Sequence, residues 1–451
     1  MLKNVLIVSS ATSEKDKTQT SLIYLATILN KLDIHFDLLD LSGTTDYFDP
    51  PQEFFSPCDS EYWLSPRIFH EASWLDYYLP NDLAEFDAVF YSALFSPDIL
   101  IHGRHSINQK KRHPNCISII GGAAMSCLND EQLSVISEAF DHVCVGYDVE
   151  NLISKVVNKY IEKIQPNYEL VDIKQFLTVY SGHGCNWGKC RFCNSAKLSN
   201  CQYYSRPAIE IAHDFEKISQ LNGRIDDVML SSDSFTQENL VEVASCLDHK
   251  KLNIPYNIML RGGKWVSEEI GELLRKSGCT DVFVGAEALN DKMLKIVNKG
   301  TNVEGTMNAI KNLSKSVKVI MGLMLFIPCV TERQLDEQLF AIEKILPYVN
   351  AIEPEILSVV YRSEFADHPE KYGIKLWATE KTINDSWCYG LSPDIPWTFC
   401  NSNDAEIWFK FYDRLKCLID GFVQPHYWDS IDYMRDRYGG NNHAIWKNRE
   451  T

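Results

Sequence analysis

Short apolar runs alternate with stretches of helical periodicity over the first third of the chain. Residues 3–9 form an apolar run, residues 19–32 repeat apolar positions every three or four residues, and residues 35–41 are apolar again. The series continues with apolar runs at 87–95, 116–124 and 141–147. Strands that alternate with helices predict a doubly wound parallel sheet, which we expect over residues 1–160.

A second alternating series follows a break at about residue 165. Its six apolar runs lie at 176–182, 227–233, 256–262, 281–287, 317–327 and 351–360. Amphipathic stretches such as 267–279 and 332–346 separate them. This pattern predicts an α/β fold in which residues 170–365 form a partial (β/α)6 barrel of the TIM type. Residues 366–451 are aromatic and irregular, and we expect a mainly helical extension that covers the barrel mouth.

Residues 42–85 carry many aromatic, Pro and Ser residues without a clear period. The stretch is long for a loop, so it is either a functional cap or contains helices that the pattern does not reveal.

Charge and composition narrow the class of protein. The chain has 451 residues and a formal net charge of −17, which argues against a broad basic face for nucleic acid. Its basic run NQKKRHP (108–114) is interpreted as a solvated helix end. No apolar run approaches the ~18 residues that a membrane-spanning helix needs. The chain opens directly on a strand pattern, and its fourteen cysteines suit a reducing compartment. We therefore expect a cytoplasmic protein without nucleic-acid or membrane partners, in which Cys329 and most other cysteines are buried.

Three cysteines fall within the ten residues GCNWGKCRFC, directly after the first strand of the second series. Parallel barrels place their chemistry at this end of the strands. Thiolates suit both zinc and iron–sulfur clusters. Zinc would need a fourth ligand such as His183 or Cys201, and zinc sites usually pair their ligands in two short knuckles. A two-iron ferredoxin would need a further cysteine on a different fold. Three cysteines on a four-iron cluster leave the fourth iron without a protein ligand, so that it can bind a substrate or cofactor. We expect Cys185, Cys190 and Cys193 to be the three ligands.

This motif resembles the radical SAM superfamily. Members hold a [4Fe–4S] cluster with three clustered cysteines, often with an aromatic residue before the third, and Phe192 matches that residue. Four residues separate the first two cysteines here, where the commonest family spacing is three. The resemblance implies that the open iron binds S-adenosyl-L-methionine (SAM), which reductive cleavage converts to methionine and a 5′-deoxyadenosyl radical. It also implies an electron donor such as flavodoxin or ferredoxin.

Later strand ends resemble the SAM-binding segments of the family. Glu287, in the stretch 278–300, matches a family glutamate that contacts the ribose or methionyl part of SAM. Ser232 and Asp233 match the segment that receives the methionyl amine. Arg261 is placed to pair with the SAM carboxylate. The structural alternatives are that Asp233 or Glu287 caps the following helix and that Arg261 forms a surface ion pair. Lys299 matches a Lys-Gly element of the cobalamin-linked branch.

The front domain resembles the cobalamin-binding domain that precedes many such barrels. The pair Gly121 and Gly122 follows the strand CISII, where open α/β sheets bind ligands, although a tight turn explains the pair equally well. Gly146 and Glu150 match a further element of that domain. The Asp-x-His-x-x-Gly signature that supplies a histidine to cobalt is absent from the first loop. The resemblance thus makes cobalamin a possible third cofactor.

Within this superfamily the sequence favours modification of a peptide or small natural-product substrate, most of all epimerisation of L to D residues. A thiol would then return hydrogen to the α-carbon, and Cys400 is preferred over Cys388 because polar residues follow it. The alternative is a cobalamin-dependent C-methyltransferase. A third hypothesis, of another class, is an iron–sulfur binding or sensor protein. The matches at Glu287 and Asp233 argue against it, because a sensor would not need residues that contact SAM.

Overall fold

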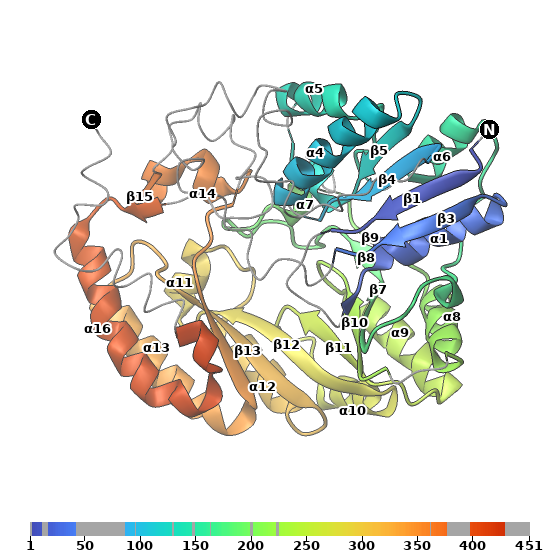
Figure 1. The fold of residues 1–451 in the computed structure, drawn as a ribbon. Helices are drawn as coiled ribbons and strands as arrows, with labels where there is room; N and C mark the ends of the chain where they lie inside the picture. Colours follow the sequence, from blue (N-terminus) through green and yellow to red (C-terminus); the bar gives the residue numbers. More distant parts are fainter. Residues whose placement is uncertain are drawn as a thin grey trace, which may run out of the picture. The chain divides into compact units, whose positions relative to one another are not determined.

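The structure, a computed structural model, describes residues 2–10, 17–41, 86–94, 96–128, 130–146, 149–162, 164–198, 202–221, 225–360, 362–376 and 397–428 (Figure 1). These residues divide into two compact units. One runs up to Tyr180 and includes 213–229, and the other contains 181–212 and the described residues from 230 onward. The stretch 42–85, with its two interpretations, lies outside the described residues.

The first unit contains the predicted doubly wound sheet. Its five strands lie in the order β3-β1-β4-β5-β6, and each neighbouring pair is parallel. The strands are β1 (Asn4–Val8), β3 (His35–Leu39), β4 (Ala88–Ser92), β5 (Ile117–Gly121) and β6 (His142–Val143). The helices are α1 (Thr20–Lys31), α4 (Ser96–Arg112), α5 (Asp130–Ala139) and α6 (Val149–Val157).

Separate apolar cores cover the two faces of this sheet. Ile99 and Ile107 of α4 and Ile136 of α5 belong to the core on one face. Leu22 of α1 and Ile153 of α6 belong to the core on the other face. Burial on both faces explains why the strands read as continuous apolar runs. The basic run forms the last turn of α4, where Lys110 donates to Asp141 at 3.0 Å, so the prediction of a helix end is confirmed.

A second sheet has seven strands in the order β14-β13-β12-β11-β10-β7-β2. The strands are β2 (Lys17–Thr18), β7 (Phe176–Tyr180), β10 (Asp227–Ser231), β11 (Tyr256–Leu260), β12 (Cys279–Glu287), β13 (Lys318–Leu325) and β14 (Ala351–Ile356). The six predicted barrel strands are all present, and β11 to β14 pair in parallel. The short strand β2 was not predicted, and it pairs in parallel with β7.

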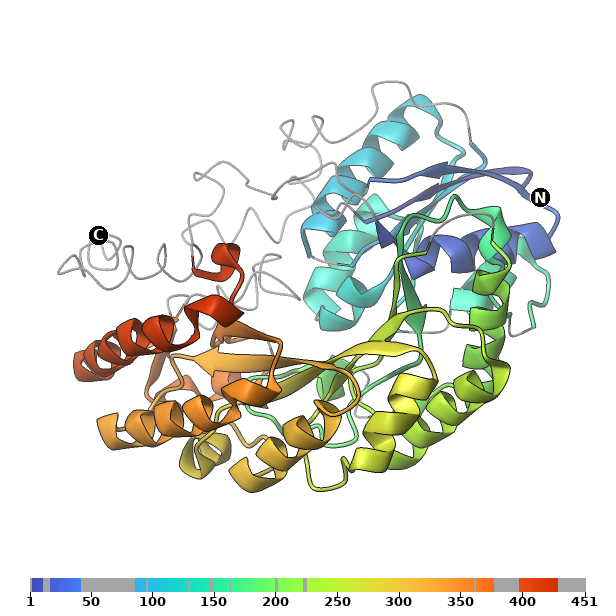
Figure 2. The ribbon, with the colours of Figure 1, turned by 90° about the horizontal axis from the view of Figure 1, so that it is seen from below.

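Helices follow the strands of this sheet, and Figure 2 shows the yellow and orange ones on its outer side. They are α8 (Ala208–Ser219), α9 (Gln237–Lys250), α10 (Glu268–Lys276), α11 (Asp291–Ile296), α12 (Val303–Leu313) and α13 (Glu332–Ile345). Polar side chains fix where they start: Thr236, Ser267 and Asn302 cap α9, α10 and α12, and Thr331 forms a capping box with Gln334 on α13.

The C-terminal part packs on the last strands of this sheet through indole groups. Trp397 donates to the Leu357 carbonyl at 2.9 Å, and the fully buried Trp408 donates to Ile327 at 2.8 Å. The described elements are α14 (Glu364–Asp367), β15 (Ile374–Leu376), β16 (Trp397–Phe399) and α16 (Ser402–Ile419).

Two further expectations concern burial. Cys116, Cys144 and Cys279 are buried as predicted, whereas Cys329 is exposed and the prediction for it is wrong. It lies in the loop after β13 with a positive φ of 58°, between the buried residues Pro328 and Val330, so only this position of the loop reaches solvent. Among the described helices, none combines the length and the apolar character required to cross a bilayer.

Candidate active site

The three-cysteine loop follows β7 and the short strand β8 (Gly182–His183), at the carboxyl end of the strands. Cys185, Cys190 and Cys193 are all half-buried thiols in the second unit. Burial raises the pKa of the Cys190 thiol to about 12. The positive charge of Lys299 opposes this shift, whereas the other two thiols reinforce it, so all these groups act on one another at short range.

Asp233 anchors the start of the loop. Its carboxylate accepts the N–H of Gly184 at 2.7 Å, and Ser234 Oγ accepts the N–H of Asn186 at 3.0 Å. Burial raises the pKa of Asp233, and the bond from Gly184 opposes that shift. The alternative that Asp233 caps a helix is wrong, because Thr236 caps α9. Ser232 follows β10, and its hydroxyl donates to the Ser234 carbonyl at 2.8 Å.

The end of α11 and the turn after it hold the rest of the loop. Trp187 Nε1 donates to the Asn298 carbonyl at 2.8 Å, and Asn298 Nδ2 donates to the Lys189 carbonyl at 2.7 Å. The Arg191 backbone N–H donates to Val297 at 3.0 Å. A Cβ on Gly300 would lie 2.3 Å from the Trp187 ring, so this close approach requires glycine. Residues 297–300 thus form a strap on the cysteine loop.

Within this strap, Lys299 forms an ion pair with Glu287. The Nζ–Oε1 distance is 2.5 Å, and Lys299 is only 8% exposed. Burial lowers the pKa of Lys299, but the Glu287 carboxylate and the thiols of Cys190 and Cys193 outweigh it, so the pKa lies above its ordinary value. The ammonium also lies 5.8 Å from the centroid of the Phe192 ring. The alternative that Glu287 caps α11 is wrong, because Asn290 caps it.

Arg261 follows β11 and faces the same loop. Its guanidinium lies 5.2 Å from the centroid of the Trp187 ring, and Nη1 donates to the Lys299 carbonyl at 3.4 Å. The alternative of a surface ion pair is wrong, because these partners are an indole and a backbone carbonyl. The cation therefore lies beside the cysteine loop, as expected for an anion-binding group.

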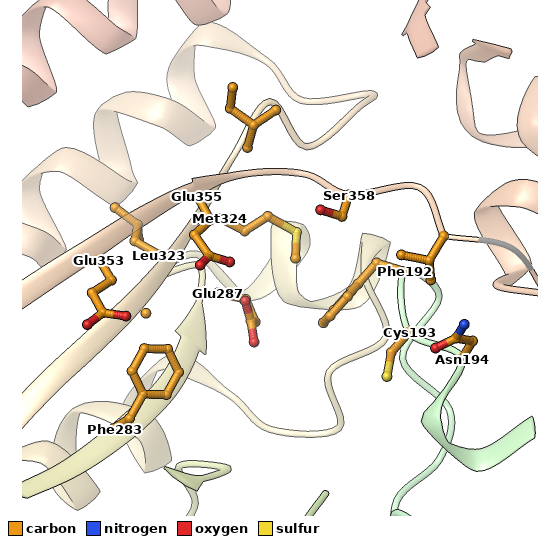
Figure 3. A pocket seen from close by; sticks show the side chains of 13 residues that line it. Phe192, Cys193, Asn194, Phe283, Glu287, Leu323, Met324, Glu353, Glu355 and Ser358 are labelled. Atoms are coloured by element: carbon orange, nitrogen blue, oxygen red, sulfur yellow. The ribbon is translucent and has the colours of Figure 1, made fainter. Parts of the chain in front are cut away.

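A cavity of about 280 Å³ opens beside the loop, as Figure 3 shows. Phe192 and Cys193 line one end of it. The ends of β12, β13 and β14 line the rest, with Glu287, Met324 and Glu355 among their side chains. Gly285 and Gly322 lie in register on β12 and β13. A Cβ on Gly322 would lie 2.3 Å from the Phe283 ring, so this glycine lets the ring lie across the neighbouring strand.

The loop fits an iron–sulfur cluster by the chemistry of its donors. The three half-buried thiols interact electrostatically, and the Ser195 backbone N–H points to Cys193 Sγ at 3.4 Å, the type of hydrogen bond that cluster sulfurs accept. Across the described residues, no three His, Cys, Asp or Glu side chains converge as ligands of a single ion would. His183, one zinc candidate, stacks on Tyr204 of β9 (Tyr204–Ser205). The other, Cys201, lies outside the described residues.

The candidate thiol donors lie elsewhere. Cys400 follows β16, is exposed, and is not among the residues that line the cavity. Its backbone N–H donates to the Gly373 carbonyl at 2.8 Å, and Cys329 is its electrostatic neighbour. Cys388 lies outside the described residues.

In the first unit, Gly121 ends β5 and Gly122 begins the turn into the 3₁₀ helix 123–127. Gly122 has a φ of 111°, and a Cβ on it would lie 2.2 Å from the Ala93 carbonyl oxygen. The tight-turn interpretation therefore holds for Gly122. The two glycines carry no side chain at the carboxyl end of β5, which also suits a ligand.

Some residues of the site are missing from the sequence-based set. They are Trp187, Asn298 and the carboxylates Glu353 and Glu355. The strand AIEPEI gives the one signal for the glutamates, because residues two apart point to the same side of a strand. Charged residues on a barrel strand that is otherwise apolar indicate a polar lumen.

Comparisons with known proteins agree with this geometry. Residues 179–340 match the radical SAM superfamily. The bacteriochlorophyllide d C-12(1)-methyltransferase of Chlorobaculum tepidum is 22% identical over 275 residues, which are 55% of this chain and 58% of that protein. The chain spans about a third to three fifths of the length of the curated relatives it matches.

Two solved structures share the fold over nearly the whole chain. The radical SAM methyltransferase TsrM from Kitasatospora setae, with cobalamin and a [4Fe–4S] cluster bound, has a TM-score of 0.63 at 13% identity and covers 94% of this chain and 91% of its own. The cobalamin-dependent SAM radical enzyme OxsB, with aqua-cobalamin and SAM bound, also has a TM-score of 0.63 at 13% identity, over 91% of this chain and 66% of its own. Residues 179–340 therefore form a radical SAM domain, and the chain has the fold that TsrM and OxsB share.

Proposed function

We propose that the protein is a cobalamin-dependent radical SAM C-methyltransferase. The observation that carries this proposal is the doubly wound sheet ahead of the barrel, with the narrow Gly121–Gly122 turn at the carboxyl end of β5. A peptide epimerase has no need of this unit, and none of the similar proteins named above is described as an epimerase. Methyl transfer therefore replaces epimerisation as the favoured reaction, and the role of Cys400 in hydrogen return stays a prediction of the epimerase hypothesis.

We assign the cluster to Cys185, Cys190 and Cys193, with Phe192 beside it, and the cobalamin to the edge of the first sheet at Gly121 and Gly122. Bound together, these cofactors supply a carbon-centred radical from SAM and a methyl group on cobalt. The chain's own residues position them. The strap 297–300 and the carboxylate of Asp233 hold the cysteine loop in place from two sides.

We assign the contacts to SAM to Ser232, Asp233, Arg261 and Glu287. Their positions support this assignment, because they follow or end β10, β11 and β12, and parallel strands bring their carboxyl ends to one edge. The Arg261 guanidinium suits a carboxylate. The Glu287 carboxylate is held by Lys299, so it is fixed in orientation before any ligand arrives.

The test is the cobalamin content of protein purified without oxygen from cells supplied with the vitamin. About one cobalamin per chain, with its absorption bands beside those of the cluster, is expected. A Gly122→Val variant should lose most of the cobalamin and keep its iron. A chain that carries the cluster but no cobalamin under these conditions would refute methyl transfer and return the epimerase hypothesis to first place. The substrate and a reductant such as flavodoxin or ferredoxin are part of the proposal.

A further inference from the structure

The cavity beside Cys193 carries a charge pattern that restricts the ligands it accepts. Its position makes it a site, because Phe192 and Cys193 of the cysteine loop line it together with Glu287. The remaining lining decides only which chemistry fits there. Two further carboxylates, those of Glu353 and Glu355, lie on the inward face of β14 (Figure 3).

The register of the strands places these two carboxylates. Glu353 pairs with Gly322 and Glu355 with Met324, so they occupy successive inward positions of the sheet. Ile352 and Pro354, between and before them, are buried on the opposite face. Glu353 is half-buried and Glu355 is exposed, and both line the cavity.

The lining is acidic as a whole. None of the thirteen residues that line the cavity is basic, and three are glutamates. Lys299 neutralises Glu287 from outside the lining. Glu353 accepts a hydrogen bond from Tyr427, a residue of the C-terminal part. The pKa of Tyr427 is raised mainly by burial and also by the negative charges of Glu353 and Glu355. Both carboxylates therefore lie close enough to interact with the same hydroxyl group.

Apart from Asn194 and Ser358, the rest of the lining is mostly apolar, and it includes two aromatic rings. The Phe283 ring lies across Gly322, and Phe192 and Met324 line the cavity as well. Aromatic faces bind flat apolar groups, and they also stabilise nearby cations. The volume of about 280 Å³ suits a group of small-molecule size, at the lower end of ligand cavities.

We propose that this cavity binds a substrate with a protonated amine or guanidinium carried on a flat apolar skeleton, with Glu353 and Glu355 receiving the cation. The inference rests on the proposed function, since it assigns the substrate class of that same site. SAM itself carries positive charge, so a test must separate the two ligands.

The experiment uses the anaerobically reconstituted full chain, loaded with SAM, and two probes of the same shape. They are 2-phenylethylamine, which is cationic at pH 7, and 2-phenylethanol, which is neutral. Titration calorimetry or ligand-observed NMR should give a Kd for the amine at least tenfold below that for the alcohol. In the double variant Glu353→Gln/Glu355→Gln the two values should lie within about twofold of each other. Glu343→Gln, which changes an exposed carboxylate on α13, should keep the wild-type preference.

Equal affinity for both probes in the wild-type protein would overturn the proposal, and so would an amine preference that survives the double variant. SAM affinity should be unchanged in the double variant. A loss of SAM affinity there would assign the carboxylates to SAM and overturn the proposal too. The proposed function is tested separately by the cobalamin content, because a wild-type protein without bound cobalamin would refute methyl transfer but not the preference of the cavity for a cation.

Discussion

Lys299 and Glu287 form a buried ion pair, with 2.5 Å between Nζ and Oε1, next to the thiols of Cys190 and Cys193. Glu287 ends β12 with a positive φ of 61°, at a shift in the register between β12 and β13. A side chain seldom adopts this backbone conformation without a strong constraint. The pair thus fixes one charge of each sign at the point where the cavity meets the cysteine loop.

Removal of the Lys299 charge should make the cluster harder to reduce. A buried unit charge at this range contributes on the order of 1–2 kcal/mol at an effective dielectric of about 20. For a one-electron couple this corresponds to a potential that is lower by roughly 40–90 mV in Lys299→Met. Redox titration followed by electron paramagnetic resonance measures the shift. Lys299→Arg keeps the charge and should stay within about 20 mV, whereas equal shifts in both variants would show that the effect is not electrostatic.

The three cysteines should account for all of the bound iron. The triple variant Cys185→Ala/Cys190→Ala/Cys193→Ala should retain less than about a tenth of the wild-type iron and sulfide after reconstitution, because cluster ligation needs thiolates. Cys279→Ala, which removes a buried thiol outside the loop, should keep its full iron content. Wild-type iron in the triple variant would refute the assignment of the ligands.

Gly122→Ala should destabilise the first unit more than Gly146→Ala. Both glycines have positive φ angles, 111° and 87°, so each substitution introduces strain of about 1–3 kcal/mol. The added Cβ also collides with the Ala93 backbone at position 122, whereas nothing lies within 4 Å of it at position 146. Urea unfolding monitored by circular dichroism compares the two. Equal losses would mean that the turn at Gly122 relaxes without cost.

Asp141 should make the stability of the first unit depend on pH. Its carboxylate accepts the Ser118 N–H at 2.7 Å and pairs with Lys110 at 3.0 Å. Burial raises the pKa of Asp141, but these bonds outweigh it, and the pKa lies below its ordinary value. A carboxyl group with a depressed pKa stabilises the fold above its unfolded pKa, and the contribution is lost as the pH falls through the folded value.

Asp141→Ala should therefore lower the free energy of unfolding by about 1 kcal/mol at pH 7, the low end for such bonds because the carboxylate is partly exposed. The difference from the wild-type protein should shrink below pH 4, in unfolding curves measured from pH 3 to 7. A difference that stays constant over this range would contradict an ionic origin.

Local patterns in the sequence determined most of the architecture. Apolar runs and helical periodicity predicted every strand from β7 to β14 that takes part in the barrel, because strand and helix burial leave periods of 2 and 3.6 residues in the sequence itself. The three-cysteine loop was equally visible, since its ligands lie within ten residues. The boundaries differ by a few residues, as for β6, which keeps only two of the residues of the predicted run 141–147.

Contacts between distant segments were decided by the tertiary structure alone. The pairing of β2 with β7 joins residues 17–18 to 176–177, and Asp233 reaches Gly184 across 49 residues. Lys299 meets Glu287 only because the turn after α11 returns to the end of β12. The direction of Glu353 into the cavity depends on the register of β13 and β14. A shift of one residue would reverse the face to which a strand's side chains point, and the strand's own sequence does not fix that register.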